Sequence, residues 1–437
     1  MDQAEAARLE QRINREVIAR FPPGSVRRVA LVRDHEDPAL EPGELLIRVF
    51  AAAWGGALDD WAQANSAGMR RLRRELSLRL PPARLLEFTV EGPGAERITL
   101  ADDPALATEP VPLAEAVPVM AGLLRTNYVF PDRGAAAADA LEASLAAGEY
   151  DGLDDEALAA KLTSQLYDVC HDRHLRVRVR PPGAGPRGPG GPGRPGRGGT
   201  PDRPPLPSWL ERHGPHSYGI HRVERLDGDV GYLDLHGVAH PEDGGPAIAA
   251  AMELVAGTGA LIIDLRQNHG GSPDGVVFWL SYLFPDASTH LNDIFDAGTG
   301  ETKQFWTLAH VPGDRYLDRP VYVLTSAKTF SGGEDFAYSL QAQGRAEVIG
   351  ETTGGGAHPT STTPVTPALA VSVPFARSVN PVTGTNWEGT GVTPDLAVPA
   401  DQAFDVAYGK ALRHLLTLDV PPPLLDEARE ALATLES

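Results

Sequence analysis

Between residues 215 and 418, short apolar runs alternate with segments in which apolar residues recur at helical spacing. The runs GDVGYLDLHG, ALIIDLRQN, RPVYVLTSA and AEVIGE predict strands, and the segments PAIAAAMELVAGTG, SPDGVVFWLSYLF and GGEDFAYSLQAQG predict helices. Continuous apolar runs are typical of strands that are buried on both faces of a largely parallel sheet. The alternation therefore predicts an α/β domain over residues 215–418, with a late strand, LAVSVPFARSVN, packed against the sheet.

Residues 112–180 have the pattern of a helical bundle subdomain that ends in a strand. The segments LAEAVPVMAGLLRTNYVF, GAAAADALEASLAAGEY and LDDEALAAKLTSQLYDVC have helical periodicity, and Asp154 or Asp155 is a suitable N-cap for the third. The apolar period changes from 3.6 to 2 in HDRHLRVRVR, which places His174 where the helical region gives way to a strand.

The remaining segments carry no recognisable chemistry. Residues 1–105 predict a small α/β module, with strands in VRRVALV, ELLIRVF and RLLEFTVE and helices in AEAARLEQRINREVIARF and ALDDWAQANSAGMRRLRRELSLRL. Residues 181–207 are almost entirely Gly, Pro and Arg, a composition typical of a flexible linker. Residues 419–437 predict a helical C-terminal tail.

Composition and charge narrow the class of protein. Of 437 residues, 42% are apolar, which is enough for a sizeable core, and the formal net charge of -20 argues against a nucleic-acid-binding surface. The single cysteine, Cys170, excludes an intrachain disulfide, and neither a secretory leader nor an apolar run of membrane-spanning length is recognisable. We therefore expect a cytoplasmic protein with no nucleic-acid or membrane partner.

The stretch KTFSGGEDFAY holds the first candidate for chemistry. Ser331 and Glu334 fit a capping box at a helix N-terminus, which is a purely structural interpretation. Gly332 and Gly333 do not fit it, because glycine in a first turn costs about 1 kcal/mol relative to alanine. Paired glycines indicate a close approach to the backbone, so Ser331 is also a candidate nucleophile whose oxyanion the Gly332 amide would hold.

A second glycine pair and several histidines extend this candidate site. Gly270 and Gly271 follow a predicted strand and either form a turn that needs positive φ or supply a second oxyanion-hole amide. Lys328 is a poor candidate base, since the turn between it and Ser331 keeps the two side chains from facing each other. The candidate bases are His171, His174, His269 and His358. No group of residues has zinc-ligand spacing, because HDRH is not H-E-x-x-H.

Six segments of the chain form a recognisable series: NYVFPD (127–132), DRHLRV (172–177), DLRQNHGG (264–271), VYVLTSAKTFSGGEDFAY (321–338), VIGETTGGGAHP (348–359) and NPVTGTNWEGTGVTPD (380–395). In this order they resemble the tail-specific or C-terminal processing family of serine peptidases. The resemblance is to the branch of tricorn-type peptidases and the modules of interphotoreceptor retinoid-binding protein. The resemblance covers about residues 112 to 410 and leaves out the first hundred residues.

The resemblance implies a role for each matched residue. Ser331 is the nucleophile, and the oxyanion hole consists of the Gly332 amide and the amide of Gly270 or Gly271. His174, in the D-x-H block, is the base, and Glu388, in the E-x-x-G-V-x-P-D block, orients it. Four further residues have supporting roles: Asp172, Asp264, Arg266 and His358.

One departure from the family pattern bears on the base. Many processing peptidases use a Ser-Lys dyad, but Gly356 stands in the lysine place of the block TTGGGAHP. A Ser-Lys mechanism is therefore unsupported, and His358 in that block is the alternative to His174.

The resemblance also implies a fold and an activity. The expected fold is the spiral ββα fold, of the broad crotonase-like and Clp-like class, for a serine peptidase that acts on peptides or unfolded proteins without a metal or organic cofactor. A homo-oligomer is compatible with it. No PDZ module is recognisable, which argues against recognition of substrate C-termini. The alternatives are a non-catalytic binder of retinoid-type or fatty-acid-type ligands and an esterase-like hydrolase.

Overall fold

The computed structural model describes residues 26–33, 45–51, 83–90, 97–101, 111–180 and 217–437. The chain forms two units, and both are discontinuous in sequence. The first consists of Met1–Gly191 and Thr360–Phe375, and the second of Pro192–Pro359 and Ala376–Ser437. The expected linker at 181–207 and the expected helices near the N-terminus lie outside the described residues.

A four-stranded sheet near the N-terminus belongs to the first unit. Its strands are β1 (Val26–Arg33), β2 (Leu45–Ala51), β3 (Ala83–Val90) and β4 (Arg97–Ala101), in that spatial order. The β1–β2 and β3–β4 pairs are antiparallel and β2–β3 is parallel. The three strands predicted from sequence are confirmed, and β4 is an additional strand that the sequence reasoning did not identify.

Three helices of the first unit confirm the predicted helical region. They are α4 (Leu113–Asn127), α5 (Pro131–Ala146) and α6 (Asp155–Cys170), and α5 packs against both of the others. The side chain of Asp154 caps α6 by accepting a hydrogen bond from the Ala157 amide at 2.8 Å. His171 ends α6 in the left-handed conformation, with φ 53°, and turns the chain toward strand β5 (Arg176–Val179).

A hairpin from the second half of the chain completes the first unit. Strands β13 (Thr360–Pro364) and β14 (Leu369–Pro374) pair with each other, and β14 also pairs with β5 in an antiparallel ladder. All six residues of β14 are buried. The single late strand predicted over 369–380 is therefore wrong: its first half is β14, and its second half is β15 (Ala376–Val379) in another sheet of the second unit.

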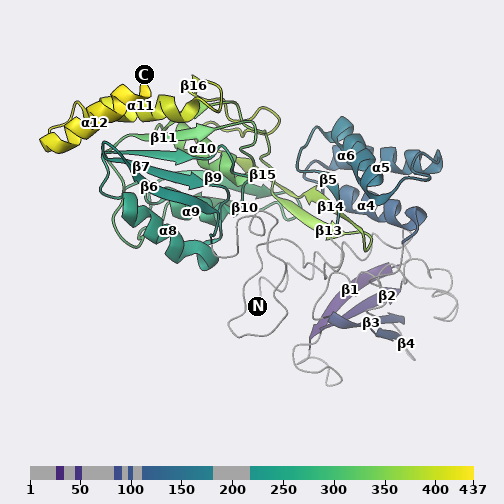
Figure 1. The fold of residues 1–437 in the computed structure, drawn as a ribbon. Coiled ribbons are helices and arrows are strands. Elements are labelled where there is room, and N and C mark those ends of the chain that lie inside the picture. Colours follow the sequence, from purple (N-terminus) through teal and green to yellow (C-terminus); the bar gives the residue numbers. More distant parts are fainter. Residues whose placement is uncertain (1–25, 34–44, 52–82, 91–96, 102–110, 181–216) are drawn as a thin grey trace. The chain divides into compact units, whose positions relative to one another are not determined.

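The second unit is built on a six-stranded sheet with helices on both faces (Figure 1). The spatial order is β16 (Leu396–Ala397), β12 (Glu347–Gly350), β11 (Val321–Thr325), β8 (Ala260–Asp264), β7 (Val230–Leu235) and β6 (Ile220–Leu226). Neighbouring strands are parallel except β6 and β7, which form an antiparallel hairpin. The predicted strand–helix alternation is thus confirmed as a mixed α/β fold.

Two hydrophobic cores lie on opposite faces of this sheet. Leu261 and Ile263 of β8 pack into the core shared with α8 (Pro241–Val255), α9 (Pro273–Leu280) and α10 (Gly332–Ala342). Ala260 and Ile262 pack into the core shared with α11 (Ala403–Leu415) and α12 (Pro422–Leu435). Because successive side chains of a strand point to opposite faces, burial on both faces requires the uninterrupted apolar run seen in the sequence.

A smaller sheet accompanies the second unit. It consists of β10 (Thr302–Trp306), β9 (His290–Asp296) and β15, all antiparallel to their neighbours. Among the helices that the structure describes, none combines the length and the apolar character needed to cross a membrane.

Candidate active site

Ser331 has an unusual backbone conformation for a non-glycine residue. It lies between strand β11 and helix α10, at the N-terminus of the helix, with φ 55° and ψ -122°. Conformations of this kind cost on the order of 1–3 kcal/mol and persist only where the surroundings hold them. A strained serine directly before a helix, in the connection from a strand of the sheet, is similar to the nucleophile elbow of other hydrolases.

The carboxylate of Glu334 holds the backbone around Ser331 in place. Its Oε2 accepts hydrogen bonds from the Ser331 amide at 2.7 Å and the Gly356 amide at 2.9 Å. Its Oε1 accepts from Thr353 Oγ1 at 2.5 Å and from the Gly355 amide at 2.6 Å. Burial raises the pKa of Glu334, and these hydrogen bonds oppose that rise. Glu334 therefore does more than complete a capping box, because it also anchors the loop at 353–356.

The glycine loop after β8 lies against the first turn of α10. Gly270 has φ 97° and Gly271 has φ 154°, which side chains rarely permit. A Cβ atom on Gly270 would lie 2.7 Å from Cβ of Ser331, and one on Gly271 would lie 2.0 Å from the Val238 carbonyl oxygen. A Cβ on Gly332 would lie 2.9 Å from the Gly271 nitrogen. Only glycine fits this close approach of two backbone segments.

Asn268 determines which amides of this loop remain available. Its Oδ1 accepts a hydrogen bond from the Gly270 amide at 2.9 Å, and its Nδ2 donates to the Leu235 carbonyl at 2.9 Å. Within the described part of the chain, the amides of Gly271 and Gly332 donate no hydrogen bond. These two neighbouring amides are therefore available to a ligand, whereas that of Gly270 is paired with Asn268.

Sequence reasoning did not identify the role of Asn268. The signal was present, because asparagine often hydrogen-bonds to the backbone amide two residues later at a turn. A Cβ on Gly333 would lie 2.6 Å from Asn268 Oδ1, so this residue also explains the second glycine of the helix start.

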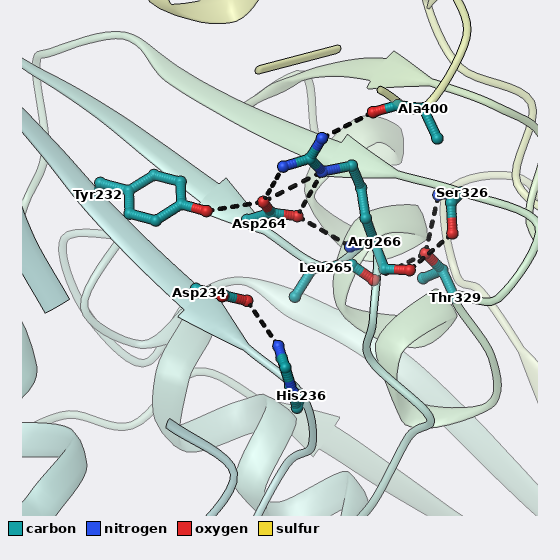
Figure 2. Close-up of polar contacts among 9 residues, drawn as sticks. All are labelled: Tyr232, Asp234, His236, Asp264, Leu265, Arg266, Ser326, Thr329 and Ala400. Carbon is teal, nitrogen blue, oxygen red and sulfur yellow. Dashed lines mark hydrogen bonds and ion pairs between the residues drawn. The ribbon is translucent and has the colours of Figure 1, made fainter. Parts of the chain in front are cut away.

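Asp264 and Arg266 form an ion pair where β8 ends (Figure 2). Arg266 donates through Nε to Asp264 Oδ1 at 3.0 Å and through Nη2 to Oδ2 at 2.6 Å, and through Nη1 to the Ala400 carbonyl at 2.7 Å. The Tyr232 hydroxyl donates to Asp264 Oδ2 at 2.8 Å, and burial together with this carboxylate raises the pKa of Tyr232. The pair fixes the end of the strand that leads into the glycine loop.

Two hydroxyl groups connect this strand end to the turn before Ser331. Ser326 Oγ donates to the Arg266 carbonyl at 2.6 Å, and Thr329 Oγ1 donates to the Leu265 carbonyl at 2.8 Å, as Figure 2 shows. The turn that positions Ser331 is thereby hydrogen-bonded to the segment that precedes the glycine loop.

Glu388 contacts a histidine within the second unit. Its Oε2 lies 3.4 Å from His358 Nδ1 and accepts a hydrogen bond from the Ala357 amide at 2.5 Å. The neighbouring Trp387 is buried and donates from its indole nitrogen to the Gly356 carbonyl at 2.7 Å. Glu388 and His358 thus lie in the same unit as Ser331, next to the loop that Glu334 anchors.

His174 and Asp172 belong to the first unit, in the turn between α6 and β5. Asp172 is buried; its Oδ1 accepts a hydrogen bond from the His174 amide at 2.9 Å, and its Oδ2 accepts one from the Tyr128 hydroxyl at 3.2 Å. These contacts give the His174 turn a defined backbone. The pairing of His174 with Ser331 joins residues of the two units and stays a prediction.

Comparisons with known proteins concern two parts of the chain. Residues 229–398 match the model of peptidase family S41, and residues 112–195 match the N-terminal domain of peptidase S41 in eukaryotic IRBP. The first match contains Ser331, both glycine pairs, His358 and Glu388, and the second contains His174.

Several solved structures are also similar to this chain. A photosystem II D1 C-terminal processing protease has 21% identity and a TM-score of 0.33, with 46% of each chain covered. A putative peptidase from Parabacteroides merdae has 19% identity and a TM-score of 0.45, with 69% of this chain and 96% of that chain covered. The tricorn protease has 14% identity and a TM-score of 0.44, with 78% of this chain and 38% of that chain covered.

The chain accordingly spans less than half the length of the processing protease and of the tricorn protease. The family matches together cover the helical region and the part of the α/β unit that carries the strained serine. The chain therefore belongs to peptidase family S41, a family of serine peptidases, and has an N-terminal domain of the type found in IRBP.

Proposed function

We propose that this chain hydrolyses peptide bonds in peptides or unfolded proteins, with Ser331 as the nucleophile. The observation that carries the proposal is the strained Ser331 at the start of α10, beside the amides of Gly271 and Gly332. Ser331 is only partly buried, and the two amides beside it donate no hydrogen bond among the described residues; both features support the proposal.

The proposed reaction assigns a role to each of these groups. Ser331 Oγ attacks the substrate carbonyl carbon while a histidine base takes the hydroxyl proton. The carbonyl oxygen becomes an oxyanion that accepts hydrogen bonds from Gly271 N and Gly332 N. The C–N bond then breaks as the histidine returns the proton to the leaving amine, and water hydrolyses the resulting acyl-serine by the same sequence of proton transfers.

Two histidines are candidates for the base. The family resemblance of the D-x-H block supports His174, with Glu388 orienting it. The contact of 3.4 Å between His358 Nδ1 and Glu388 Oε2 supports His358, which was the alternative from sequence. We propose His174 as the base and His358 as a buried partner of Glu388.

The finer description of the fold is part of this proposal. The spiral ββα fold of the crotonase-like and Clp-like class is consistent with a βαβ sheet whose strand ends carry Asp264 and the turn to Ser331. The peptide or unfolded protein substrate is what membership of the family implies.

The proposal is tested by hydrolysis of an unfolded, fluorescently labelled protein by the purified full chain. We expect Ser331→Ala to remove activity, and Ser288→Ala, which changes an exposed serine of the same unit, to leave it unchanged. His174→Gln should lower kcat by at least about 1,000-fold, while His358→Gln should have the smaller effect. The reverse order would assign the base to His358.

Activity that survives in Ser331→Ala would overturn the proposal. Absence of any hydrolysis, together with tight binding of a retinoid or fatty acid, would favour the non-catalytic binder. Faster turnover of esters than of peptides at the same site would favour an esterase.

A further inference from the structure

Three potential metal ligands lie together at the edge of the six-stranded sheet. His221 is in the edge strand β6, Asp234 is in β7 and His236 follows β7, and one ligand atom from each lies within 4.8 Å of the others. His236 Nε2 is 3.1 Å from Asp234 Oδ1, as Figure 2 shows. Tetrahedral coordination with bonds of about 2.0 Å requires ligand atoms about 3.3 Å apart, so this pair already has a suitable separation.

The local backbone explains why the third ligand is close. The β6–β7 register shifts between Ile220 and Arg222, so His221 is the extra residue of a bulge. A bulge redirects a side chain and is common at sheet edges. The His236 amide donates to the Gly219 carbonyl at 2.8 Å, which fixes the chain just before His221 to the end of β7.

The charges near these residues favour a cation. Arg266 is paired with Asp264, and Arg222 forms an ion pair with Glu224. With both arginines paired, the Asp234 carboxylate contributes the net negative charge beside the two imidazoles. A cation would therefore be attracted to the cluster, although the nearby arginines weaken that attraction.

We propose that His221, Asp234 and His236 bind a divalent transition-metal ion, with zinc as the representative ion. Two imidazole nitrogens and one carboxylate are the ligands of zinc and related transition ions, whereas calcium and magnesium prefer oxygen ligands alone. Asp234 and His236 are half-buried and His221 is exposed, so the fourth position faces solvent. The site is separate from Ser331 and does not depend on the proposed peptidase activity.

Binding requires one side chain to turn. The rings of His221 and His236 are stacked, with centroids 4.4 Å apart and planes 13° apart. Parallel rings cannot both direct an in-plane nitrogen lone pair at one ion, so one ring must rotate. His221 is the exposed member of the pair and is therefore the one that turns on binding.

The position of the site connects it to the glycine loop. The His236 carbonyl accepts a hydrogen bond from the His269 amide at 3.2 Å, and His269 directly precedes Gly270. An ion that holds His236 to β6 stabilises the β6–β7 edge together with the first residue of that loop. We assign the ion a structural role there, with no part in the bond-breaking steps.

Calorimetric titration of Zn²⁺ into metal-free full-length protein tests the proposal. The variants are His221→Gln and His236→Gln, and the matched control is His290→Gln. His290 likewise contacts a carboxylate, Asp293, at 2.7 Å and stacks on a ring, that of Trp306. Among the described residues, no third potential ligand joins His290 and Asp293. We expect Zn²⁺ affinity to fall by at least about tenfold in each test variant and to stay unchanged in the control.

Two further readouts keep the test decisive. Zn²⁺ should raise the Tm of the unmodified protein but not that of His221→Gln, which lacks the exposed ligand. Co²⁺ should give the visible absorption bands of a four-coordinate site, and these bands should be lost in His221→Gln. Equal Zn²⁺ affinity in all variants, no measurable affinity, or Mg²⁺ and Ca²⁺ binding as tight as Zn²⁺ would each overturn the proposal.

Discussion

Ser331 owes its backbone conformation to a carboxylate three residues further along the chain. The Glu334 carboxylate is completely buried and accepts hydrogen bonds from Ser331 N, Thr353 Oγ1, Gly355 N and Gly356 N. If Ser331 is the nucleophile, as proposed, Glu334 is a positioning residue that acts through the backbone. The Glu334 carboxylate contributes to the free energy of unfolding because, without it, these four donors would be buried without an acceptor.

Glu334→Gln tests this positioning role. A carboxamide has one acceptor oxygen and places an NH₂ group against donors, so we expect a loss of about 2–4 kcal/mol in the free energy of unfolding. We also expect kcat to fall with KM nearly unchanged, because substrate contacts remain.

Denaturant unfolding and steady-state kinetics measure the two effects of Glu334→Gln. The control is Glu351→Gln, whose carboxylate accepts longer hydrogen bonds, of 3.2 and 3.3 Å, from the amides of Ala400 and Ala327. A Glu334→Gln enzyme with unchanged kcat and stability would refute the positioning role.

The buried carboxyl of Asp335, the residue after Glu334, predicts how the stability of the protein depends on pH. Burial raises its pKa to about 6, and its Oδ1 accepts hydrogen bonds from Ser339 Oγ at 3.1 Å and Asn292 Nδ2 at 3.2 Å. Between about pH 4 and about pH 6, the Asp335 carboxyl is protonated in the folded state and ionised in the unfolded state. The free energy of unfolding therefore decreases as pH rises from about 4 to about 6.

Asp335→Asn removes this titration and keeps an oxygen for both donors. We expect the variant to gain stability over the unmodified protein by on the order of 3 kcal/mol between pH 4 and pH 7, measured by denaturant unfolding at both values. The exposed Asp318→Asn should reproduce the unmodified pH dependence. Equal pH profiles for Asp335→Asn and the unmodified protein would show that the carboxyl is not the titrating group.

Sequence alone explains only part of these residue roles. The capping pattern at Ser331 and Glu334 could be predicted, since it depends on residues three apart. The contacts of Glu334 with Thr353 and Gly355, and those of Asn268 with Gly333, could not. These contacts join segments that are far apart in the sequence, so a local sequence pattern does not predict them.

At the scale of elements, the loop between β8 and α9 and the start of α10 act as one structure. Gly271 contributes most to it, because its φ of 154° and its closeness to the Val238 carbonyl exclude any side chain. The loop therefore sets the separation of the two amides proposed to hold the oxyanion.

Gly271→Ala should disrupt this loop. A Cβ 2.0 Å from a backbone oxygen cannot be accommodated without displacing the chain, so we expect a loss of at least about 2 kcal/mol in stability and nearly complete loss of activity. Thermal unfolding and peptide hydrolysis measure these effects. Gly257→Ala is the matched control, since its Cβ meets nothing within 4 Å. Normal activity in Gly271→Ala would exclude the proposed oxyanion hole.

The elements that could be predicted from sequence are those with a strong apolar period. Strands β7, β8, β11 and β12 and helices α4, α6 and α10 are of this kind. The hairpin of β13 and β14 was not anticipated, because Thr360–Pro364 is rich in threonine and proline and lacks an apolar run. Its partner β14 was predicted, but as one strand with β15.

At the scale of the whole molecule, the chain does not divide into units at simple sequence boundaries. The hairpin at 360–375 belongs with the helical region more than 180 residues upstream, where β14 pairs with β5. Residue contacts across such a separation cannot be inferred from composition or periodicity, which explains why contiguous domain bounds were expected.

Val371→Pro tests whether the β13–β14 hairpin belongs to the first unit. Proline in the central strand of the β13–β14–β5 sheet removes a ladder hydrogen bond and should cost at least about 3 kcal/mol. Hydrogen exchange should accelerate in α4–α6 and change little in β7 and β8. Val323→Pro, in the internal strand β11, should give the opposite pattern. Equal acceleration in both units by Val371→Pro would contradict the division.

The central claim is that Ser331 is the nucleophile, and covalent labelling tests it most directly. The full chain is treated with a fluorophosphonate, which reacts with activated serines, and the modified residue is located by mass spectrometry of the proteolysed product. We predict a single adduct on Ser331, formed much more slowly in His174→Gln and absent when the protein is unfolded first. An adduct on Ser326 or another serine, or no adduct on the folded protein, would contradict the assignment.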